Sequence, residues 1–207
     1  MMTDISDSLL SRIIDDLAEF GWSLQTQFAP LSLTRQLAEE CRQRIFQGTL
    51  APAGTGRGNA VAVREGTRGD HIQWLEAGQS PACDGYLQLL DELRVAINQN
   101  LYLGLADYES HFAFYPPGAF YLKHLDRFLD DDRRAVSAVL YLNDDWLPDE
   151  GGVLRLYLAN GQVRDVIPAA GTLVVFLSSD VPHEVLPATR DRLSLTGWFR
   201  RRGEGPL

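Results

Sequence analysis

Cysteine, lysine and long apolar runs are all scarce in this sequence. Only two of the 207 residues are cysteines, Cys41 and Cys83, which is too few for a disulfide scaffold and matches no zinc-binding spacing. No stretch approaches the roughly 18 apolar residues of a membrane-spanning helix. The acidic amino terminus also lacks the basic segment that opens a signal peptide. We therefore expect a chain of the reducing cytoplasm that makes no contact with membranes.

Basic residues are outnumbered as well. The sequence has 19 lysines and arginines against 28 aspartates and glutamates, a formal net charge of −9. A nucleic-acid backbone would have to bind against this acidic field, so we expect no nucleic-acid partner. Lys123 is the only lysine, and the residues around it do not resemble a pyridoxal phosphate site. The length suits one domain, residues 1–207, which we expect to be monomeric.

Three segments carry apolar residues at helical spacing. The first runs from Leu9 to Phe20, with Ser6 as a candidate N-cap and Gly21 as its end. The second covers about residues 32–47 and turns Cys41 toward the core, and the third covers about residues 84–103. Amphipathic helices need an apolar surface to cover. We therefore expect residues 1–104 to form a helical support for the rest of the chain.

Glycine is concentrated between the second and third helical segments. Residues 48–70 contain six glycines and one weak strand signal, from Ala60 to Arg64. A loop this long in a compact domain is commonly a lid or a binding loop. We predict that about residues 51–70 form a protruding binding loop, called the finger below. The alternative is an irregular surface loop without a function.

From residue 109 onward the pattern changes to short apolar or alternating runs. Strands are predicted at residues 110–115, 120–123, 135–143, 153–158, 163–167, 172–177, 183–186 and 192–200. Asn160 and Gly161 between two of them indicate a type I′ hairpin turn. Short strands at this spacing are typical of a two-sheet jelly roll, or double-stranded β-helix. The predicted fold is mainly β, with residues 105–200 as the jelly-roll core and the amino-terminal helices backing one sheet.

His124, Asp126 and His183 are the candidate metal ligands. Side chains two positions apart on a strand point to the same face, so His124 and Asp126 would converge. The third ligand must come from another strand, and His183 is the candidate. Two histidines and one carboxylate form the ligand set of mononuclear Fe(II) oxygenases and leave positions open for substrate and dioxygen. A surface histidine beside a turn aspartate is the alternative.

The last predicted strand has two different faces. Arg192, Ser194, Thr196 and Trp198 alternate with Leu193, Leu195, Gly197 and Phe199. If the apolar set packs on the core, Arg192 lies in a polar cavity and needs an anion, and its planar fork suits a carboxylate. Tyr141 could supply a hydroxyl to the same carboxylate. The alternatives are a salt bridge from Arg192 to Asp165, Glu184 or Asp191, and a core role for Tyr141.

These residues and their neighbours resemble a known family. His124-x-Asp126, His183 and Arg192 nine positions later resemble the iron- and 2-oxoglutarate-dependent dioxygenases. Within that group, further motifs resemble the hypoxia-inducible-factor prolyl hydroxylases: Arg68 to Trp74, Tyr115-Pro116, Tyr121 to Asp126, Leu140 to Trp146, Gly151 to Arg155, Pro182 to Pro187 and Arg192 to Trp198. The similarity covers about residue 60 to the end. The chain resembles the bacterial prolyl 4-hydroxylases of this type, close to a bare catalytic domain.

The resemblance implies a reaction and a set of roles. His124, Asp126 and His183 would hold Fe(II). With 2-oxoglutarate and dioxygen as cosubstrates, and ascorbate as a supporting reductant, the enzyme would hydroxylate a prolyl residue at C4 and release succinate and CO2. No catalytic residue is expected beyond the metal centre.

The cosubstrate would be bound by Arg192 and Tyr141 in a pocket lined by Tyr115, Leu154 and Thr196. The substrate would be contacted by Tyr121, Arg134, Trp198 and the finger residues Arg68 and Asp70, and an Asp70–Arg134 pair would close the finger. His71 and His111 are interpreted as structural.

The substrate is left open by the sequence. For bacterial relatives the resemblance implies a prolyl residue of a large cytosolic protein, and elongation factor Tu is the first candidate. One alternative is a hydroxylase of a small molecule or of another residue type, against which the finger argues. Another is a non-catalytic jelly-roll binding or sensing module, against which the complete ligand set argues. A role in oxygen sensing would depend on the oxygen affinity.

Overall fold

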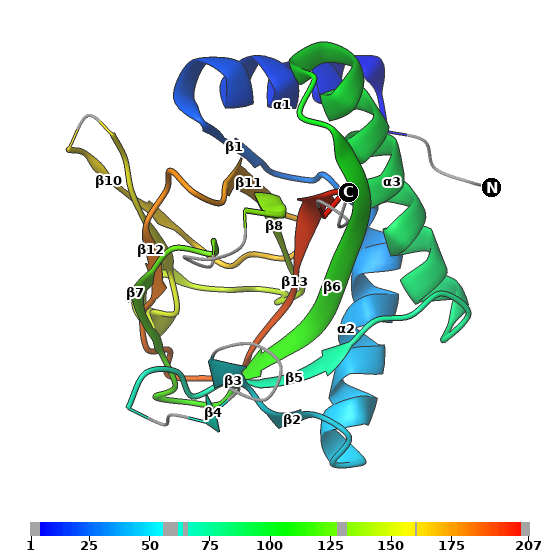
Figure 1. The fold of residues 1–207 in the computed structure, drawn as a ribbon. Coiled ribbons are helices and arrows are strands. Elements are labelled where there is room, and N and C mark those ends of the chain that lie inside the picture. The colour runs from blue at the N-terminus through cyan, green and yellow to red at the C-terminus, as the bar shows by residue number, and fades with distance from the viewer. Residues whose placement is uncertain (1–4, 56–61, 64–65, 128–131, 160, 204–207) are drawn as a thin grey trace.

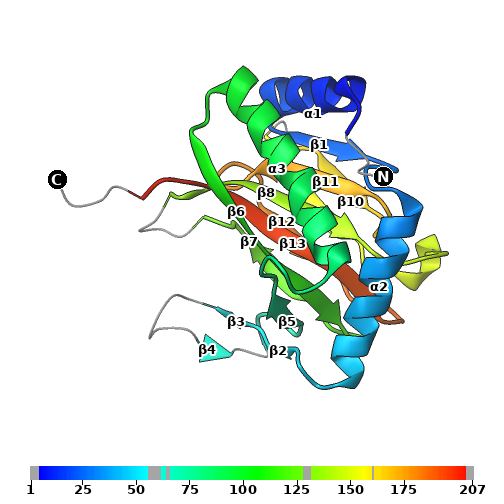
Figure 2. The same ribbon diagram turned by 90° about the vertical axis from the view of Figure 1, so that its right-hand side faces the viewer.

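Two facing antiparallel sheets, a short two-stranded sheet and three α-helices make up the described part of the molecule (Figure 1). The computed structural model describes residues 5–55, 62–63, 66–127, 132–159 and 161–203. The helices lie on the outer side of the larger sheet (Figure 2). The predicted double-stranded β-helix with its supporting helices is confirmed. Among the described helices, none has the length and apolar character needed to cross a membrane.

The helices are α1 (Asp7–Phe20), α2 (Leu31–Phe46) and α3 (Pro81–Leu101). α1 ends where predicted because Gly21 adopts the left-handed conformation, with φ 76°. Glycine has no Cβ and adopts this conformation without steric strain. α3 begins at Pro81 rather than at Asp84. Ser80 caps it by accepting a hydrogen bond from the Cys83 N–H at 3.1 Å, and a proline suits the first helical position.

The larger sheet has the strand order β1-β11-β8-β13-β6-β5-β2. Its strands are β1 (Trp22–Gln25), β2 (Ala51–Pro52), β5 (His71–Trp74), β6 (Leu105–Tyr115), β8 (Arg134–Tyr141), β11 (Leu173–Leu177) and β13 (Arg192–Arg201). The sequence did not predict β1 and β5. Both are short and are defined by pairing with distant strands, β1 with β11 and β5 with β6. Such strands depend more on tertiary contacts than on local propensity.

The smaller sheet has the order β10-β9-β12-β7. Its strands are β7 (Tyr121–His124), β9 (Leu154–Tyr157), β10 (Val163–Val166) and β12 (His183–Val185), and the 3₁₀ turn Pro148–Glu150 precedes β9. The β9–β10 hairpin is confirmed, although Asn160 of its predicted turn lies outside the described residues. A separate pair, β3 (Gly54–Thr55) and β4 (Ala62–Val63), lies in the predicted finger. β4 is the described part of the strand predicted at residues 60–64.

Two apolar clusters hold these layers together. One lies between the helices and the larger sheet and includes Cys41 together with Leu193, Leu195 and Phe199 of β13. The other lies between the two sheets and includes Tyr115, Val139, Leu156 and Phe176. Burial of each such large side chain stabilises the folded state by about 1.5–3 kcal/mol relative to leaving it exposed. The alternation predicted for the last strand is confirmed, since its apolar side chains face the helices and its other face borders a cavity.

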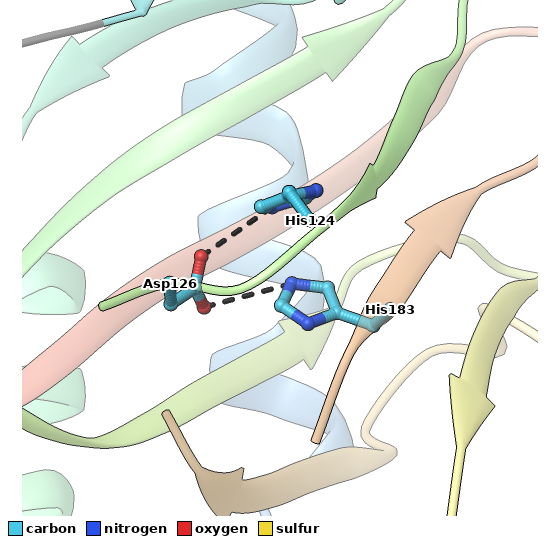
Figure 3. A group of neighbouring side chains, drawn as sticks. All are labelled: His124, Asp126 and His183. Carbon is cyan, nitrogen blue, oxygen red and sulfur yellow. Dashed lines mark ion pairs between the residues drawn. The ribbon is translucent and has the colours of Figure 1, made fainter. Parts of the chain in front are cut away.

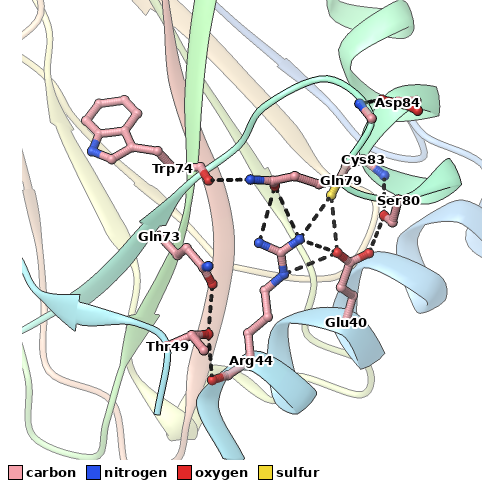
Figure 4. Close-up of polar contacts among 10 residues, drawn as sticks. Glu40, Arg44, Thr49, Gln73, Trp74, Gln79, Ser80, Cys83 and Asp84 are labelled. Atoms are coloured by element: carbon pink, nitrogen blue, oxygen red, sulfur yellow. Dashed lines mark hydrogen bonds and ion pairs between the residues drawn. The ribbon is translucent and has the colours of Figure 1, made fainter. Parts of the chain in front are cut away.

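A polar cluster joins α2, α3 and β5 at one edge of the helical layer (Figure 4). Glu40 accepts hydrogen bonds from Ser80 and Arg44, and Gln79 donates to the Trp74 carbonyl at 3.3 Å. Burial alone would raise the pKa of Glu40, but the hydrogen bonds from Ser80 and Arg44 lower it. The cluster therefore ties β5 to two helices through an ionised carboxylate.

Gly197→Ala is expected to destabilise the fold. Gly197 lies within β13, where a Cβ would overlap the Glu109 carbonyl oxygen and the Tyr108 side chain of β6. Overpacking of this kind costs about 1–3 kcal/mol, so the urea midpoint of unfolding should fall. Gly66→Ala is the matched control, because a Cβ at Gly66 would meet open space. Equal midpoints for the two variants would contradict the expectation.

Candidate metal centre

His124, Asp126 and His183 converge at the end of the smaller sheet (Figure 3). His124 ends β7, and β12 places His183 directly opposite it. The carboxylate of Asp126 lies between the two imidazoles, with His124 Nε2 3.4 Å from Oδ1 and His183 Nε2 3.6 Å from Oδ2. One ligand atom from each residue lies within 4.8 Å of the others. The predicted convergence is confirmed.

Backbone carbonyls determine the tautomer of both histidines. His124 Nδ1 lies 2.7 Å from the Leu122 carbonyl oxygen, and His183 Nδ1 lies 3.1 Å from that of Val181. A carbonyl only accepts hydrogen bonds, so each Nδ1 carries the hydrogen and each Nε2 keeps its lone pair. The Tyr121 ring stacks on His124 with 3.6 Å between centroids. Two neutral nitrogens and one carboxylate oxygen are a donor set that fits divalent iron.

Asp126 is ionised in this setting. Burial acts to raise its pKa, but His183 and His124 in their protonated forms, and a hydrogen bond from Ser137, lower it far below the ordinary value. Burial lowers the pKa of His183, which favours the neutral ring that a metal requires. The three side chains are only 19%, 9% and 7% exposed. The site therefore presents one negative charge and two lone pairs in a largely dry environment.

A cavity of about 370 Å³ adjoins the three side chains. Its walls include all the predicted site residues other than Tyr141, namely His124, Asp126, His183, Arg192, Tyr115, Leu154, Thr196, Arg68, Asp70, Tyr121, Arg134 and Trp198. They come from both sheets and from the finger, so residues more than 100 positions apart in the chain share one wall.

Arg192 is buried at this wall, with 2% of the residue exposed. Its Nε donates to the Gly152 carbonyl at 2.8 Å, and its guanidinium carbon lies 5.1 Å from the ring centroids of both Tyr115 and Tyr141. Within the described ranges, no carboxylate forms an ion pair with it. A buried guanidinium without a counter-ion is costly. The cavity is therefore complementary to an anion.

The carboxylates offered as alternative partners of Arg192 lie elsewhere. Asp165 pairs with Arg155 at 2.8 Å, and Glu184 lies 3.9 Å from the same arginine. Asp191 precedes Arg192 on the chain and forms no ion pair with it among the residues described. The alternative of an internal salt bridge is therefore wrong.

Tyr141 lies beside the same guanidinium rather than on the cavity wall. Its hydroxyl is buried and has no hydrogen-bond partner in the part of the chain that the structure describes. Burial raises its pKa to about 12, against the opposing effect of Arg192, so the hydroxyl remains a donor. An unsatisfied buried hydroxyl costs about 1–3 kcal/mol. A carboxylate bound at Arg192 and Tyr141 would satisfy both groups.

Asp70 pairs with Arg68 and not, as predicted, with Arg134. Arg68 Nε and Nη2 donate to the two carboxylate oxygens of Asp70 at 2.7 and 2.6 Å. Arg134 instead donates to Glu109 at 2.9 Å and lies 3.5 Å over the Trp198 ring. The predicted pair is wrong for this structure. Arg68 is two residues from Asp70 and can meet it on one face with bidentate geometry.

Trp74 and His111 also line the cavity and were not assigned to it from the sequence. They lie opposite each other on β5 and β6, with ring centroids 5.1 Å apart in an edge-on arrangement. Trp74 was missed because β5 itself was missed. His111 was interpreted as structural, yet it shares its strand face with Tyr115 four residues later. The period of two along that strand could have placed it on the cavity wall.

The stability of the fold should depend on pH through His111. Burial lowers the pKa of His111 to about 4 from an ordinary value of 6.5. Between pH 4 and pH 6.5 the unfolded chain binds more protons at His111 than the folded protein does. The contribution of the neutral His111 to the free energy of unfolding is therefore complete above pH 6.5 and is lost as the pH falls toward 4. From pH 7 to pH 5, the free energy of unfolding should fall by about 2 kcal/mol more for the parent than for His111→Leu. Urea titrations measure this difference, and equal losses in both proteins would contradict it.

A histidine, aspartate and histidine that meet beside a cavity between two antiparallel sheets define a mononuclear non-haem iron oxygenase. The family described as the 2OG-Fe(II) oxygenase superfamily matches residues 110–200. The crystal structure of a Pseudomonas putida prolyl-4-hydroxylase is 61% identical, with a TM-score of 0.87 over 94% of this chain and 100% of that one. The chain belongs to the 2-oxoglutarate-dependent prolyl 4-hydroxylases of the hypoxia-inducible-factor prolyl hydroxylase type.

More distant relatives are similar over most of the chain. Human Egl nine homolog 1 is 32% identical over 179 residues, which cover 79% of this chain and 42% of that protein. A prolyl hydroxylase from Trichoplax adhaerens, solved in complex with a peptide fragment of the hypoxia-inducible factor oxygen degradation domain, is 26% identical, with a TM-score of 0.84 over 93% of this chain and 89% of that one. The chain spans between 29% and 52% of the length of four of the curated relatives that it matches.

Proposed function

We propose that this chain hydroxylates a prolyl residue of a protein substrate at C4, with 2-oxoglutarate as cosubstrate. The observation that carries the proposal is one cavity bordered by a complete iron-binding set and by a buried arginine without a counter-ion among the described residues. Bound iron supplies the oxidising chemistry, in which one oxygen atom of O2 enters the prolyl C–H bond and the other enters succinate as CO2 leaves. We place the reaction in the cytoplasm, in keeping with the two buried free thiols.

The chain's own part in this reaction is to bind, orient and exclude water. Arg192 supplies a planar fork for the far carboxylate of 2-oxoglutarate, and the Tyr141 hydroxyl donates to the same group. Tyr115, Leu154 and Thr196 border the cosubstrate on the cavity wall. Because Arg192 and the metal ligands border the same cavity, an extended dicarboxylate can meet both. No proton transfer by a protein side chain is needed beyond the metal centre.

The substrate is proposed to bind over the outer wall of the cavity. Trp198, with Arg134 stacked on it, and Tyr121, between Arg68 and His124, give the cavity wall aromatic surfaces next to fixed charges. Such surfaces suit a proline ring and the polar peptide groups around it. The peptide complex of the Trichoplax adhaerens relative supports a peptide ligand. Elongation factor Tu is our first candidate for the protein that carries the proline.

The test is a search for oxygenated prolyl peptides. The protein is loaded anaerobically with Fe(II) and 2-oxoglutarate, exposed to air with a bacterial cell extract, and the digest is examined by mass spectrometry. We expect prolyl peptides that gain one oxygen with the parent and not with His124→Ala, and purified elongation factor Tu is assayed in the same way. Metal-dependent succinate release without any oxygenated prolyl peptide would favour a small-molecule substrate. Absence of metal-dependent succinate release would contradict the proposed activity.

A further inference from the structure

Two buried serines lie behind the metal-binding carboxylate. Ser137 is on β8, and Ser178 follows β11, the strand paired with β8. Both residues have no exposed surface. The Ser137 hydroxyl lies 2.7 Å from Asp126 Oδ2 and 2.8 Å from the Ser178 hydroxyl. The three groups therefore form a continuous chain of hydrogen bonds that runs from the larger sheet to the ligand after β7.

The direction of these hydrogen bonds follows from their geometry. The Ser137 hydroxyl donates its single hydrogen to Asp126 Oδ2. Ser137 can then meet Ser178 only as an acceptor, so Ser178 donates to Ser137. Each hydroxyl is thereby held in one rotational state. Hydrogen bonds in such a chain polarise and strengthen one another in a low-dielectric interior.

The surroundings of the two serines give them no other evident purpose. Ser137 shares its face of the sheet with Val139 on β8 and with Phe176, its partner on β11, and both are buried apolar residues. A hydroxyl placed there costs free energy unless it is hydrogen-bonded. Ser137 and Ser178 meet this requirement through each other and through Asp126, a candidate metal ligand. Ser194 on β13 is a useful contrast, since it is also completely buried but its hydroxyl has no partner in the described structure.

We propose that Ser137, supported by Ser178, is a positioning residue that holds the Asp126 carboxylate in its ligand orientation before the metal binds. The inference rests on the proposed iron centre. The hydrogen bond to Oδ2 prevents the carboxylate from turning, so Oδ1 stays directed to the side of His124, 3.4 Å from its Nε2. Removing a hydrogen-bond partner that orients a metal ligand in this way commonly lowers the metal affinity 10- to 100-fold.

The test is a titration of the intact metal-free protein with Mn(II), followed by the loss of the free-ion electron paramagnetic resonance signal. Ser137→Ala is expected to weaken Mn(II) binding about tenfold and Ser178→Ala about threefold. Ser194→Ala, the matched control, should bind as the parent does. The Co(II) absorption spectrum provides a second readout, because its intensity reports the coordination geometry and should change in Ser137→Ala. Thermal unfolding without metal shows whether each variant is folded.

The outcomes separate a positioning role from a structural one. If Ser137→Ala and Ser178→Ala bind Mn(II) within twofold of the parent, the proposal is overturned, whatever their melting temperatures. If Ser137→Ala fails to fold, Ser178→Ala decides alone, because it leaves the contact with Asp126 in place and removes only its support. A parent that binds no Mn(II) would overturn the metal centre and this inference together. Weaker binding in both serine variants with an unchanged control supports the proposal.

Discussion

Replacing Asp126 by asparagine is expected to lower the affinity for divalent metal at least 100-fold, about 2.7 kcal/mol, and to abolish metal-dependent succinate release. The amide has nearly the same size and can still accept the hydrogen bond from Ser137. It lacks the negative charge, which is the only one in the set of three ligands. The variant therefore loses the electrostatic attraction between this charge and a divalent metal ion in a largely buried site. Mn(II) titration and quantification of succinate measure the two effects.

Asp165→Asn is the control for this substitution. Asp165 is ion-paired with Arg155, lies outside the cavity lining, and has a side chain that is 42% exposed. An exposed pair of this kind contributes little to stability, so the variant should bind metal and release succinate as the parent does. Unaltered metal binding by Asp126→Asn would exclude Asp126 as a ligand.

Replacing Arg192 by methionine is expected to raise the KM for 2-oxoglutarate on the order of 100-fold without lowering the stability of the ligand-free protein. Truncating one partner of a buried, hydrogen-bonded charge pair costs about 2–5 kcal/mol in binding. In the ligand-free protein the same guanidinium has no carboxylate partner among the residues described. An apolar side chain there relieves a desolvation cost. Succinate release at varied 2-oxoglutarate, and thermal unfolding with and without it, measure the two effects.

Arg192→Lys and Arg155→Met complete this experiment. Lysine keeps the charge but loses the planar fork and the Nε contact with the Gly152 carbonyl, so a rise in KM of about tenfold is expected. Arg155 pairs with Asp165 away from the cavity, and its replacement should leave the KM unchanged. A large loss of ligand-free stability in Arg192→Met, with an unchanged KM, would assign Arg192 a structural role instead.

Much of the fold could be predicted because the information lies in local patterns. Apolar spacing placed the three helices, and Gly21 ended the first because a left-handed conformation is needed there. Alternation along β13 predicted the orientation of Arg192 from the sequence alone, since the period of two assigns every side chain to a face. β1 and β5 could not be predicted in this way. Their four-residue segments carry no strong pattern, and pairing with β11 and β6 makes them strands.

The candidate site also combines features that the sequence predicts with features that only the tertiary structure determines. By itself the sequence determined which residue types were available for a metal and an anion, and which strand face each one occupied. Only the tertiary structure decided how those faces meet: that Asp70 binds Arg68 rather than Arg134, that Tyr141 lies behind Arg192, that His111 borders the cavity, and that Ser137 reaches Asp126. The physical reason is that periodicity assigns direction within one strand. Distances of a few ångströms between strands depend on how the two sheets pack.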